Sequence, residues 1–159
     1  MTTRAVMLDF DGVLNTPRTW GKFPPEQALD RDKVERVAAW VEAVDAHVVI
    51  SSAWRTGHAL DDLRQFLQGR GFATAWNRVI GVTVSRIFSR RDWEIREYLA
   101  RHPEIGSFVV LDDMPTLGLD RFGARFIQTN PETGVTEADL DRATAALRRR
   151  WRRSGRRAA

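Results

Sequence analysis

Short apolar runs alternate along this chain with segments of helical periodicity, and this alternation restricts its fold more than any other feature. Five runs rich in β-branched and apolar residues predict strands at residues 4–8, 47–50, 79–84, 108–111 and 125–128. Apolar residues three and four positions apart predict helices at residues 31–44, 59–67 and 93–99, and a last helix opening at Thr136. Strands alternating with helices form a mostly parallel sheet covered on both faces. We therefore expect an α/β fold, a three-layer α/β/α sandwich with a Rossmann-like sheet.

Length and composition favour one intracellular domain. A chain of 159 residues, 43% of them hydrophobic, is long enough to bury a single core. The chain has no cysteine, so a metal would be held by carboxylate, carbonyl or imidazole groups, which favours hard cations. After Met-Thr-Thr-Arg, only four apolar residues precede Asp9, too few for a signal peptide or a membrane span. We expect a soluble, cytoplasmic protein without membrane contact.

The charge is concentrated at one end. The net charge is +4, but residues 148–159 hold seven arginines and no acid, whereas residues 1–147 hold 18 basic and 21 acidic groups. We therefore divide the chain into a domain at residues 1–147 and an arginine-rich tail at residues 148–159. The tail is either the solvated end of the last helix or a tether for nucleic-acid backbones.

Acidic and hydroxyl side chains stand where three of the predicted strands end. Asp9 and Asp11 follow the first strand, Ser51 follows the second, and Asp112 and Asp113 follow the fourth. Parallel sheets bind ligands at the carboxyl ends of their strands. Aspartates that meet there repel one another unless a cation lies between them, and Mg²⁺ prefers such oxygen ligands. We expect Mg²⁺ on Asp9, Asp11 and Asp113, with Asp112 either a fourth ligand or the partner of a basic residue.

The spacing of Asp9 and Asp11 suits two linked tasks. If the chain bends at Gly12, the two carboxylates can separate and act on different atoms. One carboxylate can attack phosphorus and form an aspartyl-phosphate. The other can protonate the leaving oxygen and then activate water.

These motifs resemble those of haloacid dehalogenase (HAD) superfamily phosphatases. Residues 8–15, Leu-Asp-Phe-Asp-Gly-Val-Leu-Asn, resemble the first motif, with its aspartate pair around one residue. Residues 48–51 resemble the second motif, whose final Ser or Thr bonds the phosphoryl group, and residues 111–113 resemble the fourth, whose second aspartate completes the metal site. The resemblance implies a HAD-like phosphatase that uses Asp9 as nucleophile, Asp11 as acid and base, Ser51 as phosphate ligand and Mg²⁺ as cofactor.

The third motif of that superfamily is a Lys or Arg that neutralises phosphate charge. We assign it to Arg91, at the start of a predicted helix, with Arg90 as the alternative. The order of residues 51–55, 81–83, 91–99 and 111–113 resembles, more narrowly, the small phosphatase domains of bacterial RNA-repair proteins. This similarity covers about residues 4–147.

Further candidates lie near these motifs. Ser52 contacts substrate or caps the following helix, Arg55 reaches the substrate or is a solvated charge, and Asn15 binds substrate or only forms a turn. Three tryptophans fall in loops near the predicted cleft and either pack there or stack on bases: Trp20, Trp54 and Trp76.

The gaps between motifs are too short for a cap domain. About 40 residues separate Asp11 from Ser51, much of that helix, which leaves only a flap at about residues 13–28. An open cleft suits a large substrate that closes the site itself. With the basic tail and the RNA-repair resemblance, this predicts removal of a terminal phosphate, a 3′-phosphate in the first instance, from a polynucleotide or nucleotide.

Two other functions remain open, a phosphatase of small phosphate esters or phosphoproteins and a non-catalytic module that binds phosphorylated ends. The chain lacks the Gly-x-x-x-x-Gly-Lys-(Ser/Thr) loop of kinases. A kinase or ligase step would therefore come from a separate partner.

Overall fold

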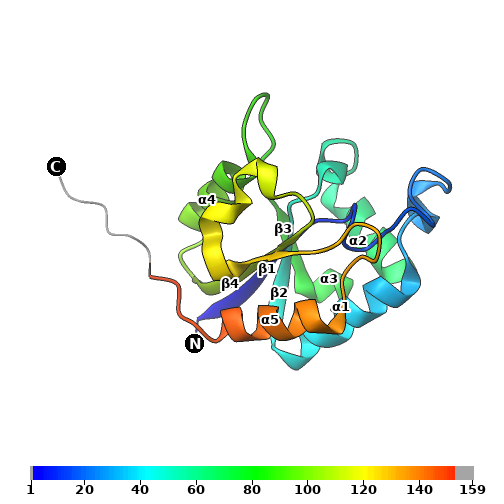
Figure 1. Ribbon diagram of the computed structural model, residues 1–159. Helices are drawn as coiled ribbons and strands as arrows, with labels where there is room; N and C mark the ends of the chain where they lie inside the picture. The colour runs from blue at the N-terminus through cyan, green and yellow to red at the C-terminus, as the bar shows by residue number, and fades with distance from the viewer. Residues whose placement is uncertain (1, 153–159) are drawn as a thin grey trace.

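The computed structural model describes residues 2–152 and has at its centre a parallel β-sheet (Figure 1). Within these residues the sheet has five strands, in the order β3-β2-β1-β4-β5. Every neighbouring pair in it is parallel. The strands are β1 (Thr3–Leu8), β2 (Ala46–Ile50), β3 (Val79–Val82), β4 (Ile105–Asp112) and β5 (Phe126–Gln128).

The central strand fixes the level at which its neighbours end. Residues 5–8 of β1 are all buried, as expected for a strand covered on both faces. Leu8 pairs with Ile50 of β2 on one side and with Leu111 of β4 on the other. The residues that come next on each strand therefore lie level with one another at the carboxyl edge of the sheet.

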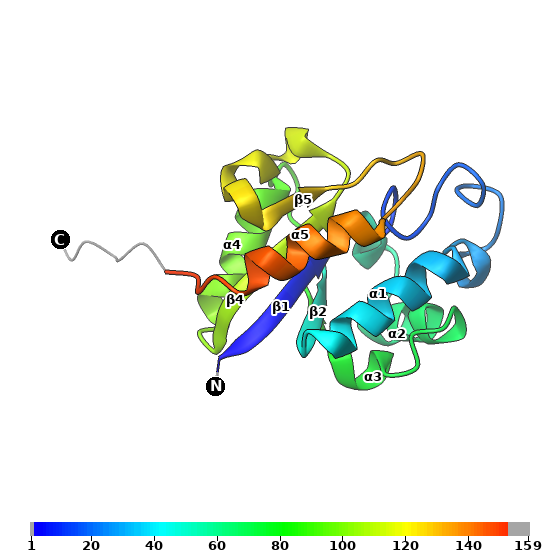
Figure 2. The same cartoon turned by 60° about the horizontal axis from the view of Figure 1, so that its bottom comes forward.

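Helices cover both faces of the sheet (Figures 1 and 2). One face carries the larger hydrophobic cluster, and its helices are α1 (Arg31–Ala43), α2 (Leu60–Gly69), α3 (Ala75–Arg78) and α5 (Glu137–Leu147). The other face carries a smaller cluster beneath α4 (Arg91–Arg101) and the 3₁₀ helix η4 (Leu119–Arg125). α1 and α5 lie side by side, and Trp40 Nε1 of α1 donates a hydrogen bond of 2.9 Å to Thr144 of α5.

The predicted three-layer α/β/α architecture with a parallel sheet is confirmed. Within residues 2–152, no separate cap domain covers the carboxyl edge of the sheet. The short helix α3 was not anticipated, because four residues are too few to display a helical period. The third strand ends at Val82 rather than at residue 84, because the carbonyls of Thr83 and Val84 accept hydrogen bonds from Arg55.

Both ends of the described chain lie at the amino edge of the sheet. The backbone N–H of Trp151 donates to the carbonyl of Gly106 at 2.9 Å, and a Cβ on Gly106 would meet the side chain of Thr2. Arg148, Arg149 and Arg150, the first arginines of the tail, are exposed there. Residues 153–159 of the predicted tail lie outside the described residues.

Helix lengths and hydropathy bear on membrane contact. Among the helices of residues 2–152, none has both the length and the apolar character needed to span a bilayer.

Candidate active site

Three aspartates gather at the carboxyl edge of β1 and β4. Asp9 follows β1 and is 4% exposed, Asp112 closes β4 and is fully buried, and Asp113 is partly buried. One carboxylate oxygen from each of the three lies within 4.8 Å of the others. The chain holds them there because the N–H of Asp9 donates to the carbonyl of Leu111 at 3.0 Å, which continues the parallel ladder past the end of β1.

Arg91 lies against this group from the first turn of α4. Its Nη1 is 3.4 Å from Asp9 Oδ2 and donates a hydrogen bond to Asp112 Oδ2. Arg90, one residue earlier, points elsewhere: its half-exposed side chain pairs with Asp92 at 3.1 Å. Of the two arginines considered for the third motif, Arg91 is therefore the one that faces the carboxylates.

The surroundings of Asp9 make its ionised form costly. Burial, together with the neighbouring Asp112 carboxylate, raises the pKa of the Asp9 carboxyl from its ordinary 3.8 to about 8, and Arg91 partly opposes this rise. Burial and Asp112 also raise the pKa of Asp113. The three carboxyls together thus carry more negative charge, when ionised, than the Arg91 guanidinium offsets.

A divalent cation fits this charge balance. Among the described residues, three carboxylates face the single guanidinium of Arg91 at this position. Asp112 is already engaged, since it also accepts a hydrogen bond of 2.9 Å from the N–H of Met114. Asp9 and Asp113 are therefore the side chains best placed to hold Mg²⁺, and carboxylate oxygens are its preferred ligands.

Gly12 brings the first and fourth motifs into contact. Its φ of +77° is in the left-handed region, and a Cβ at this position would lie 2.5 Å from Asp113 Oδ2. Any other residue here would displace the Asp113 carboxylate. The glycine thus serves both the turn after Asp11 and the space that the carboxylate needs.

Asp11 takes a different place from the one predicted for a metal ligand. Its carboxylate is not part of the three-aspartate group, because Oδ1 accepts hydrogen bonds from Asn15 Nδ2 at 2.7 Å and from Trp54 Nε1 at 3.1 Å. Asn15 is itself fully buried and accepts from the N–H of Gly12 at 3.1 Å. Asn15 therefore orients Asp11 instead of offering its amide to a substrate, and Asp11 is held as a separate carboxylate beside the group.

Two buried hydroxyls at the ends of neighbouring strands lack partners. Ser51 follows β2 and Thr83 follows β3, and neither Ser51 Oγ nor Thr83 Oγ1 has a hydrogen-bond partner among the described residues. The unmade hydrogen bond of a buried hydroxyl costs about 1–3 kcal/mol. A ligand oxygen at the sheet edge would satisfy Ser51, the hydroxyl that stands level with Asp9.

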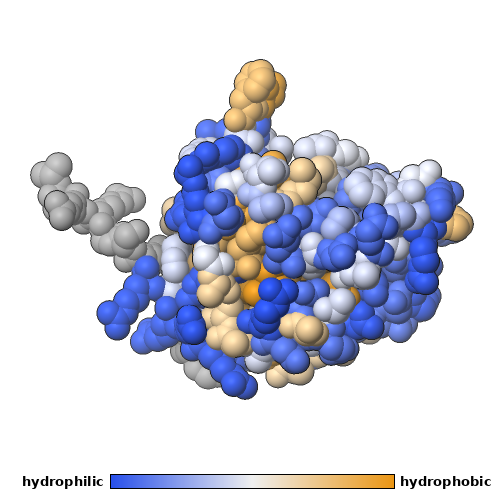
Figure 3. All heavy atoms as spheres, viewed as in Figure 1, coloured by the Kyte–Doolittle hydropathy of each residue, from blue (hydrophilic) through white to orange (hydrophobic). Residues whose placement is uncertain are grey.

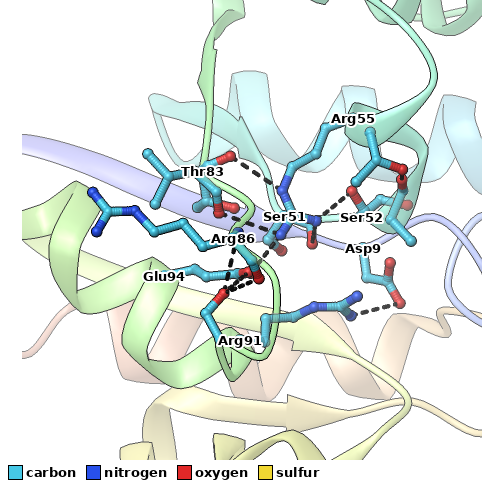
Figure 4. A network of polar contacts seen from close by, with 12 residues as sticks. Asp9, Ser51, Ser52, Arg55, Thr83, Arg86, Arg91 and Glu94 are labelled. Carbon is cyan, nitrogen blue, oxygen red and sulfur yellow. Dashed lines mark hydrogen bonds and ion pairs between the residues drawn. The ribbon is translucent and has the colours of Figure 1, made fainter.

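Ser52 and Arg55 are committed to the protein itself (Figure 4). Ser52 caps the 3₁₀ helix η2 (Ala53–Thr56), accepting from the N–H of Trp54 at 3.3 Å. The Arg55 guanidinium is 5% exposed and donates to the carbonyls of Ser51 at 2.7 Å, Ser52 at 2.6 Å and Thr83 at 3.1 Å. Ser52 thus makes the cap that was its alternative role, and Arg55 is buried and is not a solvated charge. Their contacts with substrate stay predictions.

A buried ion pair ties the second motif to the third. Arg55 pairs with Glu94 of α4, and both side chains are almost completely buried. Ser89 also donates to Glu94, at 2.6 Å. The pair fixes the serine loop against the helix that carries Arg91, which holds the two phosphate-binding candidates at a constant separation.

The three loop tryptophans have separate surroundings. Trp54 packs edge-on against Phe10 and Phe66, with ring centroids 5.4 and 6.2 Å away, while its indole N–H holds Asp11. Trp76 lies on α3, away from the carboxyl edge, and donates to Gln68 at 3.0 Å. Trp20, in the segment predicted to form a flap at residues 13–28, is 52% exposed.

Without a bound divalent cation, the stability of the protein is expected to depend on pH through Asp9. In the unfolded chain the Asp9 carboxyl ionises near pH 3.9. In the folded protein without metal, its pKa of about 8 keeps the same carboxyl protonated up to about that pH. A pKa that is higher in the folded state stabilises the fold fully at a pH below the unfolded-state pKa. This stabilisation is lost as the pH rises through the folded-state pKa. With EDTA, the melting temperature should therefore fall between pH 5 and pH 8, by roughly 2–4 °C per kcal/mol lost.

Asp9→Asn is the matched control for this measurement. The variant has no carboxyl to ionise, so its melting temperature at pH 8 should exceed that of the metal-free wild type, and Mg²⁺ should raise it much less. Identical pH profiles for the two proteins would contradict the assignment of the effect to Asp9.

The parallel α/β sheet and the motifs at its carboxyl edge define a domain of the HAD superfamily. More narrowly, the chain belongs to the family of HAD domains in Swiss Army Knife RNA repair proteins, which matches residues 5–140. The similarity to RNA-repair phosphatase domains predicted from the motifs is thus confirmed, and the family supports a phosphatase-type role. Neither a curated protein nor a solved structure matches the chain.

Proposed function

We propose that this protein is a Mg²⁺-dependent phosphohydrolase that removes a terminal phosphate, in the first instance a 3′-phosphate, from a polynucleotide or nucleotide. The observation that carries the proposal is the position of Asp9. Its buried carboxylate lies 3.4 Å from the Arg91 guanidinium, at the strand edge where the Ser51 hydroxyl has no hydrogen-bond partner among residues 2–152. This is the arrangement that a phosphoryl group in transfer to a carboxylate requires.

The first step would be attack of an Asp9 carboxylate oxygen on phosphorus. An O–P bond forms to Asp9 while the bond from phosphorus to the leaving sugar oxygen breaks, and Asp11 donates a proton to that oxygen. Arg91 and the Ser51 hydroxyl would bind the phosphoryl oxygens as charge develops on them. Asn15 and Trp54 keep the Asp11 carboxylate directed for this role.

The second step would release the phosphate. Asp11, now ionised, takes a proton from water as the water oxygen attacks phosphorus, and the bond between phosphorus and Asp9 breaks. Inorganic phosphate leaves and both carboxyls regain their starting states. When bound at Asp9 and Asp113, Mg²⁺ supplies positive charge that favours ionised Asp9 and neutralises the phosphoryl oxygens.

The open edge of the sheet supports a large substrate. With no cap domain within residues 2–152, the nucleotide chain behind the phosphate can extend into solvent. The family of RNA-repair HAD domains favours a nucleic-acid end over other phosphate esters. A second contact through the arginine tail is also proposed, and a kinase or ligase step would fall to another protein.

Phosphate release from matched substrates tests the proposal. We expect release from a 3′-phosphorylated oligonucleotide at least about tenfold faster, by kcat/KM, than from its 5′-phosphorylated counterpart or from glycerol phosphate, because bound nucleotide contributes binding energy to the reaction. EDTA should stop release and added Mg²⁺ should restore it. Asp9→Asn, purified in parallel, controls for contaminating phosphatases.

The outcomes separate the alternatives. Faster release from the 5′-phosphorylated strand would support a phosphohydrolase of nucleic-acid ends but would assign it to the 5′-phosphate. Release from glycerol phosphate alone would favour a phosphatase of small esters, and binding of phosphorylated oligonucleotide without release would favour a binding module.

A further inference from the structure

The loop between β3 and α4 carries an apolar tip that is exposed in the described part of the chain. Ile87 is 86% exposed and Phe88 is 100% exposed, the two most exposed large hydrophobic residues among those described. The loop stands out from the body of the domain in Figure 1, and its tip forms the hydrophobic projection at the top of Figure 3. Single exposed apolar residues are common, but two adjacent ones at the tip of a projecting loop indicate a contact surface.

The backbone at this tip favours a residue other than phenylalanine. Phe88 has a φ of +66°, in the left-handed region, where a side chain other than glycine costs roughly 1–2 kcal/mol. A glycine there would relieve the strain, and the exposed ring contributes no packing in return. Strain without a structural benefit points to a use for the side chain outside the fold.

The base of the loop is nevertheless firmly attached to the candidate active site. The N–H of Ser89 donates to the carbonyl of Arg86 at 3.0 Å, which closes a tight turn around the tip. The Ser89 hydroxyl donates to Glu94 at 2.6 Å, and Glu94 pairs with Arg55 beneath the serine loop. The tip is therefore presented in a fixed place and does not hang from a free strand.

The tip also lies near the position expected for the phosphate. Phe88 and Arg91 are three positions apart in the chain, so their Cα atoms are at most about 11 Å apart. Arg86 and Arg90, on either side of the tip, have side chains 59% and 51% exposed. Both arginines are paired with acids of α4, Arg86 with Glu97 and Arg90 with Asp92, so the exposed ring is the group left to contact a substrate. An aromatic ring near a phosphate site suits the base that is joined to that phosphate, because the ring can stack on the base.

We propose that Phe88, supported by Ile87, stacks on the base of the nucleotide whose terminal phosphate enters the Asp9 cleft. The inference rests on the proposed function and specifies its substrate as an end with an unpaired, accessible base. Stacking does not depend on base identity, so the tip would select single-stranded or frayed ends without strong sequence preference.

The test compares an oligonucleotide carrying the preferred end phosphate with the same oligonucleotide lacking bases at its last two positions. Phe88→Ala should lower kcat/KM on the base-bearing strand by about tenfold or more, mainly through KM, and on the base-free strand by less than about threefold. Phe88→Trp should keep the difference between the strands. Trp76→Ala, which removes an exposed aromatic away from the cleft, is the matched control and should leave the ratio unchanged.

A binding measurement keeps this inference separable from the reaction. With Asp9→Asn as the background, a fluorescent adenine analogue at the phosphorylated end should be quenched on binding, and Phe88→Ala should remove most of the quenching. If the quenching depends on Phe88 but the wild type releases no phosphate, the stacking inference is upheld and the proposed function is refuted.

Other results would overturn the inference. Equal losses on the two strands would show a merely structural loop, and Asp9-dependent release unaffected by Phe88→Ala would exclude stacking. If Phe88→Ala lost binding to phosphatidylserine vesicles while the ratio of kcat/KM on the two strands stayed unchanged, the tip would be assigned to a lipid surface. If it instead lost self-association in sedimentation, with the same unchanged ratio, the tip would be assigned to a second copy of the chain.

Discussion

Phosphate release by the Asp9→Asn variant is expected to fall at least about a thousandfold below the wild type. The amide nitrogen and oxygen of asparagine do not attack phosphorus, so no covalent intermediate can form. The fold should survive, because asparagine has the same shape and adds no charge to a pocket that disfavours charge. Single-turnover assays with Mg²⁺ measure the loss, and a melting curve establishes that the variant is folded.

Asp11→Asn provides the contrast for this prediction. Asparagine at this position can still accept from Asn15 and Trp54, but it cannot take a proton from water. With a substrate whose leaving group needs no proton, such as an aryl phosphate, the variant should form the phosphoenzyme and hydrolyse it slowly. Mass spectrometry after an acid quench should detect one phosphoryl group on the protein. Undiminished turnover by Asp9→Asn would refute Asp9 as nucleophile.

Replacing Arg91 with glutamine should have the second-largest effect, a loss of about 10²–10³ in kcat/KM. The guanidinium is the cation that the described structure places against both Asp9 and Asp112. Without it, two buried carboxylates face each other and a phosphoryl group would meet uncompensated charge. Part of the loss should therefore be recovered by raising the Mg²⁺ concentration.

Arg90→Gln is the matched control for this substitution. It removes the same charge one residue away, from a half-exposed side chain that pairs with Asp92. We expect less than about a threefold change in kcat/KM, because Arg90 faces Asp92 and not the carboxylates of the candidate site. Equal losses in the two variants would mean that overall charge near the cleft matters and the position of Arg91 does not.

The sheet and its acidic edge could be predicted from sequence because both follow from local patterns. Each strand is a short apolar run, and the ends of parallel strands meet at one edge whatever the loops do. The register of β1 with β2 and β4 then sets Asp9 level with Ser51 and Asp112. The choice between Arg90 and Arg91 depends on the exact residue at which α4 begins, because a shift of one residue along a helix turns the side chain by about 100°.

The residues that support the site were harder to predict because their contacts link distant parts of the chain. Trp54 reaches Asp11 across 43 residues and Arg55 reaches Glu94 across 39. No short-range pattern shows which of 25 basic side chains will be buried. The available signal was proximity: Trp54 and Arg55 directly follow Ser51 and Ser52, and Glu94 follows Arg91 within one helical turn.

The contact of Thr2 and Trp151 with Gly106 has a practical consequence for handling this domain. Because both described ends leave from the edge opposite the carboxylates, an affinity tag, a surface linker or a neighbouring domain joined directly at Thr2 or at Arg152 would start on the far side of the domain from the candidate site. Immobilised through such a joint, the domain would present its open edge to solution, where even a folded RNA could approach it without obstruction.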